Sequence, residues 1–157
     1  MLIRILIDGY SLLHRWPELA PGRPRHSAAA RDALLQKLRI YCDASHTPIT
    51  VIFDGQGAPP GTPAPDSGRD LEVLYSARGR TADDLIERAT FRLREFGDVL
   101  VVTDDHAEQE TVSASGALVS SCRPFIQQVE ERLKEAQADL RAVNQREQQR
   151  FQRGRGP

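Results

Sequence analysis

Three short apolar runs in this chain are each followed within two residues by an aspartate. The runs cover residues 2–7, 49–53 and 99–102, and the acids are Asp8, Asp54 and Asp104. Continuous hydrophobic runs of this length are typical of parallel strands that are buried on both faces. Because ligands bind beyond the carboxyl ends of such strands, the sequence predicts a parallel sheet with carboxylates gathered at one edge.

Helical patterns alternate with the strands. We expect helices that open at Ser27 and Thr81, a short helix over 106–114, a long helix from about residue 124, and further strands at 71–75 and 117–120. The segment 55–69 holds four prolines and four glycines and is predicted to be a mobile surface loop. The alternation predicts the α/β class, as a three-layer α/β/α sandwich with a central parallel sheet.

Composition limits the classes of protein that need considering. The chain has 157 residues, of which 39% are hydrophobic and 27% charged, as expected for one globular domain. No apolar run has the length of a membrane span, and the opening segment is too short for a signal peptide, so we expect a cytoplasmic protein. In that compartment Cys42 and Cys122 are expected to be free thiols. The net charge of −1 provides no general attraction to nucleic acid.

The acidic residues predict a metal site. Carboxylates that lie within about 4 to 6 Å of one another raise each other's pKa, and a cation relieves that cost. Mg²⁺ and Mn²⁺ prefer oxygen ligands, so either ion suits such a group. The candidate ligands are Asp8, Asp54, Asp83, Glu87, Asp104 and Asp105.

Each candidate also has an ordinary structural explanation. Asp8 and Asp54 each precede a glycine, which is common in turns. Asp83 and Glu87 share a helix face, but acids in a first helical turn are favoured by the helix dipole alone. One of Asp104 and Asp105 is expected to serve only as the cap of the next helix.

Positive and aromatic side chains near these acids suggest RNA contacts. Arg78 and Arg80 precede the acidic helical turn, and Arg23 and Arg25 lie in a loop rich in proline. Arginine suits phosphate contacts, and Tyr10 is a candidate for stacking on a base. The four histidines have no metal-ligand spacing and are interpreted as surface or loop residues.

A series of motifs occurs in a fixed order along the chain. They are Asp8-Gly9-Tyr10, Phe53-Asp54-Gly55, Tyr75-Ser76, Thr81-Ala82-Asp83-Asp84-Leu85-Ile86-Glu87, Thr103-Asp104-Asp105 with Glu108-Gln109, and Gly116-Ala117. This series resembles the YacP-like branch of the NYN domains, which belong to the PIN-like nuclease superfamily. The resemblance covers roughly residues 1–140 and leaves 141–157 as an Arg/Gln-rich tail, the end of a long helix followed by a disordered segment.

The resemblance implies a PIN-like fold and an endoribonuclease that depends on Mg²⁺ or Mn²⁺. It implies that Asp8, Asp83 and Asp105 are the catalytic ligands, with Asp54 and Glu87 in support. Ser11 stands where the family usually has asparagine, and it is itself among the residues expected to bind RNA. The expected partners are RNA, in particular mRNA, and the translating ribosome, with no membrane; self-association stays open.

Two other functions remain open from the residues. A protein with the same fold and no activity would be an RNA- or ribosome-binding adaptor, although the matched carboxylates argue for catalysis. A phosphatase with an aspartyl nucleophile usually needs Asp-x-Asp after its first strand, and here Tyr10 occupies the second acidic place. The expected reaction is therefore hydrolysis of a phosphodiester.

Overall fold

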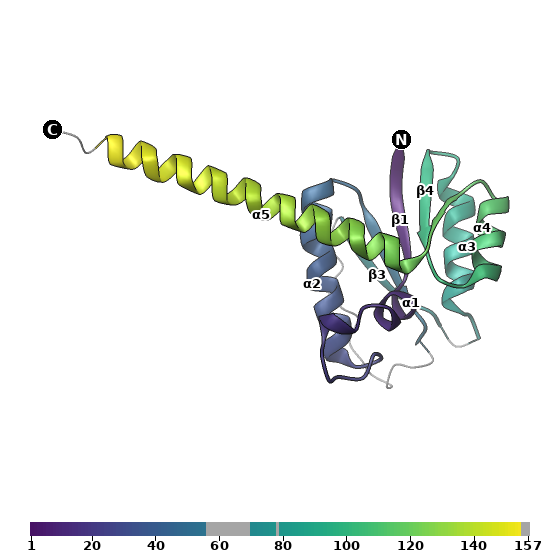
Figure 1. The fold of residues 1–157 in the computed structure, drawn as a ribbon. Coiled ribbons are helices and arrows are strands. Elements are labelled where there is room, and N and C mark those ends of the chain that lie inside the picture. The colour runs from purple at the N-terminus through teal and green to yellow at the C-terminus, as the bar shows by residue number, and fades with distance from the viewer. Residues whose placement is uncertain (56–69, 78, 155–157) are drawn as a thin grey trace.

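The centre of the molecule is one parallel sheet, with strand order β3-β2-β1-β4-β5 (Figure 1). The structure is a computed structural model that describes residues 1–55, 70–77 and 79–154. The strands are β1 Leu2–Asp8, β2 Ile49–Phe53, β3 Leu71–Tyr75, β4 Asp98–Val102 and β5 Leu118–Ser120. The parallel sheet predicted from the apolar runs is confirmed, and β1 lies in its middle.

Helices cover both faces of the sheet, which confirms the three-layer arrangement. One face carries α1 (Gly9–His14), α2 (Ala28–Ser45) and the first turns of α5 (Cys122–Arg153), and the short 3₁₀ helix η1 (Pro17–Leu19) follows α1. The other face carries α3 (Ala82–Leu93) and α4 (His106–Ala114). The helices α1, α3, α4 and α5 each follow a strand, so the edge where strands end is also the edge where these helices begin.

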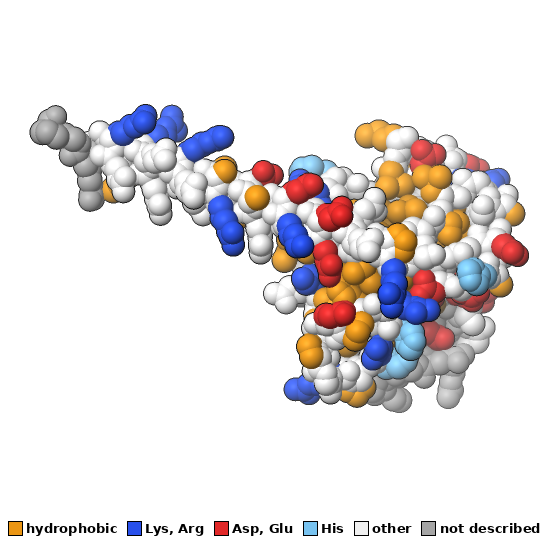
Figure 2. All heavy atoms as spheres, viewed as in Figure 1, with side chains coloured by type: hydrophobic (Ala, Val, Ile, Leu, Met, Phe, Trp, Pro, Cys, Tyr) orange, Lys and Arg blue, Asp and Glu red, His pale blue; other side chains and the backbone are white. Residues whose placement is uncertain are grey.

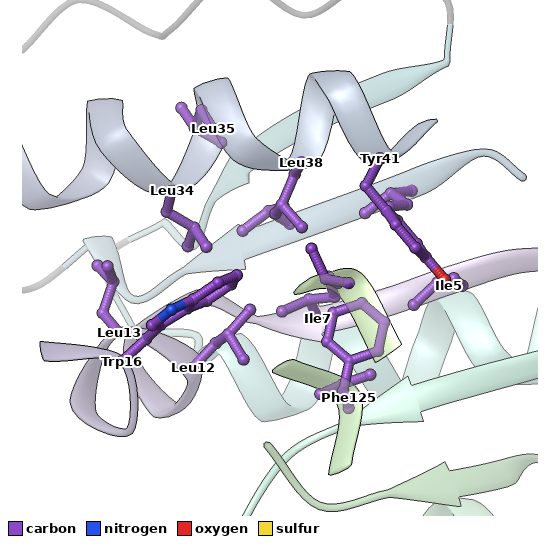
Figure 3. Packing of buried hydrophobic residues seen from close by; sticks show 14 of the residues in the cluster. Ile5, Ile7, Leu12, Leu13, Trp16, Leu34, Leu35, Leu38, Tyr41 and Phe125 are labelled. Atoms are coloured by element: carbon purple, nitrogen blue, oxygen red, sulfur yellow. The ribbon is translucent and has the colours of Figure 1, made fainter. Parts of the chain in front are cut away.

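The side chains of β1 divide between two cores. Ile5 and Ile7 pack under α1, α2 and α5, where Leu38 and Phe125 are also buried (Figure 3). Leu6 points to the other face and packs with Ile86 of α3. Because all three β1 side chains are at most 2% exposed, both faces of the strand stabilise its position. The end of β1 is therefore a fixed point for a site.

Local capping explains where the helices begin. The hydroxyl of Ser27 accepts from the backbone of Ala30 at the start of α2, and Thr81 and Asp84 form a reciprocal capping box at the start of α3. Both helix starts were predicted from the sequence. The short helix α1 was not predicted, and the long helix begins at Cys122, two residues before the expected position. The predicted loop 55–69 lies outside the described residues except for Gly55.

The helix α5 extends beyond the body of the molecule. Figure 1 shows its second half projecting away from the sheet, and the residues from Ala138 to Arg153 are exposed. Figure 2 shows Lys and Arg side chains along this projection. The helix runs without interruption across residue 140, where we placed the boundary of the nuclease domain. Among the described residues, no helix has both the length and the apolar character that crossing a membrane requires.

Candidate active site

Three carboxylates from distant parts of the chain meet at the carboxyl edge of the sheet. Asp8 ends β1, Asp83 lies in the first turn of α3, and Glu108 lies in the first turn of α4. One carboxylate oxygen from each lies within 4.8 Å of the other two. The predicted meeting of Asp8 and Asp83 is therefore present, and Glu108 is added to it.

Glu108 is the most unusual member of this acidic group. It is 3% exposed, and neither of its carboxylate oxygens has a hydrogen-bond partner among the described residues. Burial, with the neighbouring Asp83 and Asp8 carboxyls adding to its effect, raises the pKa of Glu108 to about 8. A buried carboxylate without a donor, facing two more carboxyls, fits a hard divalent cation with oxygen ligands.

Asp8 is held in place by the turn that follows it. Its carboxylate accepts from the Ser11 backbone N–H at 3.3 Å and from the Ser11 hydroxyl at 3.1 Å, and so caps α1. Burial raises the pKa of Asp8, the bonds from Ser11 oppose this, and the charges of Asp83 and Asp105 add to it. Ser11 in the family's asparagine place therefore still contacts Asp8 through its side chain.

Gly9 is required by packing. A Cβ at Gly9 would lie 2.4 Å from Cε1 of the Phe53 ring, which is fully buried at the end of β2. The glycine therefore lets the start of α1 approach the aromatic core.

The two aspartates after β4 have separate roles. Oδ1 of Asp105 accepts from the backbone N–H groups of Ala107 and Glu108 and so caps α4. Asp105 is also near enough to the acidic group for its charge to raise the pKa of Asp8. The cap fixes the first turn of α4, which carries Glu108.

Asp104 connects three elements. Its Oδ2 accepts from Nε of Arg15 at 2.7 Å, and its Oδ1 accepts from the backbone N–H of Cys122 at 2.9 Å. Burial disfavours the ionised carboxylate, but the hydrogen bonds from Cys122 and Arg15 outweigh it, so that the pKa of Asp104 is lowered. These contacts give Asp104 a structural role, since they tie the end of α1 and the start of α5 to the end of β4.

Asp54 and Glu87 lie on different surfaces. Asp54 lines the same hollow as Asp8 and Asp83, and its Oδ1 accepts from the Ser76 hydroxyl at 3.2 Å. Glu87 lies one turn further along α3 and lines a separate hollow with Phe91. The structure thus places Asp54 beside the acidic group and does not bring Glu87 into it.

The hollow at this edge has a volume of about 410 Å³. The residues that line it are Asp8, Tyr10, Ser11, His26, Asp54, Thr81, Ala82 and Asp83. Tyr10 and Ser11, both predicted to bind RNA, are therefore at the site. A volume of this size is within the usual range for a small-molecule or nucleotide site.

Of the four arginines predicted to bind RNA, the three that the structure describes do not line the hollow. Arg23, Arg25 and Arg80 are exposed, and Nε of Arg25 donates to the backbone carbonyl of His14 at 3.0 Å. Arg78 lies outside the described residues. Any contact of these three described arginines with RNA would therefore be made outside the hollow.

The sequence did not predict Glu108 as a ligand. The available signal was its spacing, since it lies three residues after Asp105, the cap of α4, in the Thr-x-Asp-x-x-Glu-Gln motif. Acids at this helical position usually have only a capping role. Here the adjacent Gln109 bonds to the backbone carbonyl of Thr103 at 2.6 Å, so the turn is fixed from both sides.

Comparison with known proteins agrees with this geometry. The family model for the YacP-like NYN domain matches residues 5–154. The Bacillus subtilis (strain 168) protein YacP is 30% identical over 127 residues, which are 80% of this chain and 74% of YacP.

Solved structures agree as well. The crystal structure of Rae1 (YacP) from Bacillus subtilis superposes with a TM-score of 0.81 at 28% identity, over 94% of this chain and 84% of Rae1. A tryptophan-to-leucine mutant of Rae1 gives a TM-score of 0.77 at 26% identity, over 91% and 84% of the two chains. With the family model, the relative and the fold in agreement, this chain belongs to the YacP-like NYN domain family and has its PIN-like nuclease fold.

Proposed function

We propose that this protein is a metal-dependent endoribonuclease. The observation that carries the proposal is the group of Asp8, Asp83 and Glu108, whose carboxylate oxygens lie within 4.8 Å of one another at the edge of a nuclease fold. The buried, unpartnered carboxylate of Glu108 favours a cation at this point over a purely structural cluster.

The proposed ligands of the cation are Asp8, Asp83 and Glu108. When bound, Mg²⁺ or Mn²⁺ lowers the pKa of a water and stabilises negative charge on a phosphate. Ser11 holds the Asp8 carboxylate in one orientation, and Asp105 fixes the turn that carries Glu108. Asp105 is proposed to position Glu108 through the cap of α4, and the catalytic role that the family resemblance implied for it stays a prediction.

The proposed reaction is hydrolysis of an internal phosphodiester of RNA by water. Attack by water, not by the neighbouring 2′-hydroxyl, leaves a 5′-phosphate and a 3′-hydroxyl. Products that end in a 2′,3′-cyclic phosphate would contradict this route. The proposed substrate is mRNA, and the proposed setting is the translating ribosome.

The experiment is cleavage of an end-labelled mRNA, naked and on translating ribosomes, with Mg²⁺ or Mn²⁺. We expect cuts by the wild-type protein that are lost with a chelator and with Asp83→Asn. Asp139→Asn is the matched control, because Asp139 is exposed on the projecting part of α5. Cuts that survive both the chelator and Asp83→Asn would refute a metal-dependent site, and folded protein that makes no cut would favour the adaptor.

A further inference from the structure

Two aromatic side chains line the hollow together with the acids. Tyr10 follows β1, and His26 lies in the segment before α2. Their ring centroids are 4.5 Å apart and their planes are tilted by 52°. Tyr10 is half-buried and His26 is exposed, so this aromatic wall, defined here as Tyr10 and His26, is open to a ligand.

A buried arginine supports the aromatic wall from behind. Arg31 of α2 is 6% exposed, and its Nη1 donates to the hydroxyl of Tyr10 at 3.4 Å and to the backbone carbonyl of His26 at 2.7 Å. The Tyr10 ring also rests against Phe53, with centroids 5.1 Å apart. The Tyr10 ring and the backbone at His26 are therefore held before any ligand arrives, which lowers the entropy cost of binding.

Flat aromatic rings beside the acidic group that is proposed to cleave RNA suit a nucleobase in particular. Every nucleobase has a π-face, and stacking on an aromatic side chain contributes to binding whatever the base. Asp8 and Asp83 line the same hollow as the wall, so a nucleotide whose phosphate lies at the acids has its base within reach of the rings.

We propose that Tyr10 and His26 form a nucleobase subsite that holds an unpaired base beside the phosphate to be cut. The inference rests on the proposed function and adds His26, a residue that the sequence led us to interpret as an ordinary surface residue. A base in a duplex is already stacked between its neighbours and cannot enter the hollow. The enzyme therefore selects single-stranded RNA, or a loop, at the cut.

The test is a binding experiment that does not depend on catalysis. A short labelled single-stranded RNA and versions with one abasic site at each position in turn are titrated with Asp83→Asn protein, and anisotropy is measured. We expect one abasic position to weaken binding by about tenfold. The same measurements are made in Asp83→Asn combined with His26→Ala, with His26→Phe, and with His14→Ala as the control at another exposed histidine.

The losses of affinity caused by the abasic site and by His26→Ala should not be additive, because both changes remove the same contact. With His26→Ala, the penalty at that abasic position should fall to less than about twofold, whereas His26→Phe and His14→Ala should keep it. An unchanged penalty with His26→Ala, or no abasic position that matters, overturns the subsite. If the RNA shows the penalty at one abasic position that depends on His26, but wild-type protein never cuts it, only the nuclease proposal is refuted. If wild-type protein cuts the RNA and no such penalty is found, only the subsite is refuted.

Discussion

Ser11 donates two hydrogen bonds to Asp8, from its backbone N–H to Oδ1 at 3.3 Å and from its hydroxyl to Oδ2 at 3.1 Å. The pair joins the end of β1 to the first turn of α1, and it leaves the Asp8 carboxylate oriented toward Asp83 and Glu108. The backbone and the hydroxyl of one residue thus together orient one of the three acids.

Ser11→Ala removes the side-chain bond and keeps the backbone bond. Because a hydrogen bond to a charged group contributes about 1.5 to 3 kcal/mol, we expect a loss of roughly tenfold or more in kcat/KM for RNA cleavage. Ser11→Asn should retain most of the activity, since an amide can donate to the same carboxylate. Ser113→Ala on the exposed side of α4 is the control, and equal activity of Ser11→Ala and wild type would show that the hydroxyl is dispensable.

Glu108→Gln should change stability in opposite directions with and without metal. In a chelator at neutral pH the variant should be more stable than wild type by about 1 to 3 kcal/mol, because folding of the wild type must either protonate Glu108 or bury its charge, and the amide requires neither. With Mn²⁺ in excess the wild type should gain about 2.7 kcal/mol at a concentration of 100 Kd, and the variant should gain much less. Thermal denaturation measures both, with the exposed Glu110→Gln as control; a variant that responds to Mn²⁺ like wild type would exclude Glu108 as a ligand.

The metal-free protein should lose stability as pH rises. The pKa of Glu108 is raised from 4.5 to about 8 on folding, so the folded state binds this proton more tightly than the unfolded chain. Its contribution is fully present below pH 4.5 and is lost as pH rises toward 8. Denaturant unfolding in a chelator across this range measures the slope, and Glu108→Gln should flatten it. A slope that is the same in both proteins would assign the effect to other groups.

Asp104→Ala should destabilise the fold without removing the response to metal. It deletes the partner of Arg15 and of the Cys122 N–H, and we expect a loss of about 1 to 3 kcal/mol in the free energy of unfolding. Because the pKa of Asp104 is lowered on folding, its contribution is lost as pH falls through that value. Denaturant unfolding and Mn²⁺ titration separate the two roles. A stable variant that no longer responds to Mn²⁺ would make Asp104 a ligand after all.

Gly9→Ala should be strongly destabilising for steric reasons. The new Cβ would lie 2.4 Å from the Phe53 ring, and overpacking of this kind typically costs about 1 to 3 kcal/mol. Gly154→Ala is the control, since the nearest atom to a Cβ there is 3.6 Å away. Thermal denaturation of both variants, and of Gly9→Ala combined with Phe53→Leu, tests the cause. The double variant should recover part of the loss if the ring is responsible.

The strands and most helix starts could be predicted because their signals are local. The apolar run 49–53 has the bounds of β2, and Ser27 and Thr81 cap the helices as their residue types suggest. The helix α1 could not be predicted in this way. It has six residues and begins at a glycine, a poor helix former, and it is stabilised by the Asp8 cap and by burial of Leu12 and Leu13. Both of these depend on the folded sheet.

The same distinction between local signals and tertiary packing applies to the residues of the site. Asp8 and Asp83 stand out because a strand end and a helix start are visible in the sequence. Glu108 has the sequence context of an ordinary acid in a first helical turn, and only its burial beside two other carboxyls distinguishes it. Burial depends on tertiary packing, and the spacing of Glu108 after Asp105 is equally that of an ordinary capping acid.

The position of β1 between β2 and β4 also determines when the acidic group can assemble during synthesis of the chain. β1 is made first, yet one of its edges is completed only when β4 emerges, and Glu108 follows still later. Domains form as units while the chain grows, and pairings between distant segments come slowly. A partly made chain therefore has Asp8 and Asp83 without their third acid, so the proposed site would be incomplete until α4 has folded against the sheet.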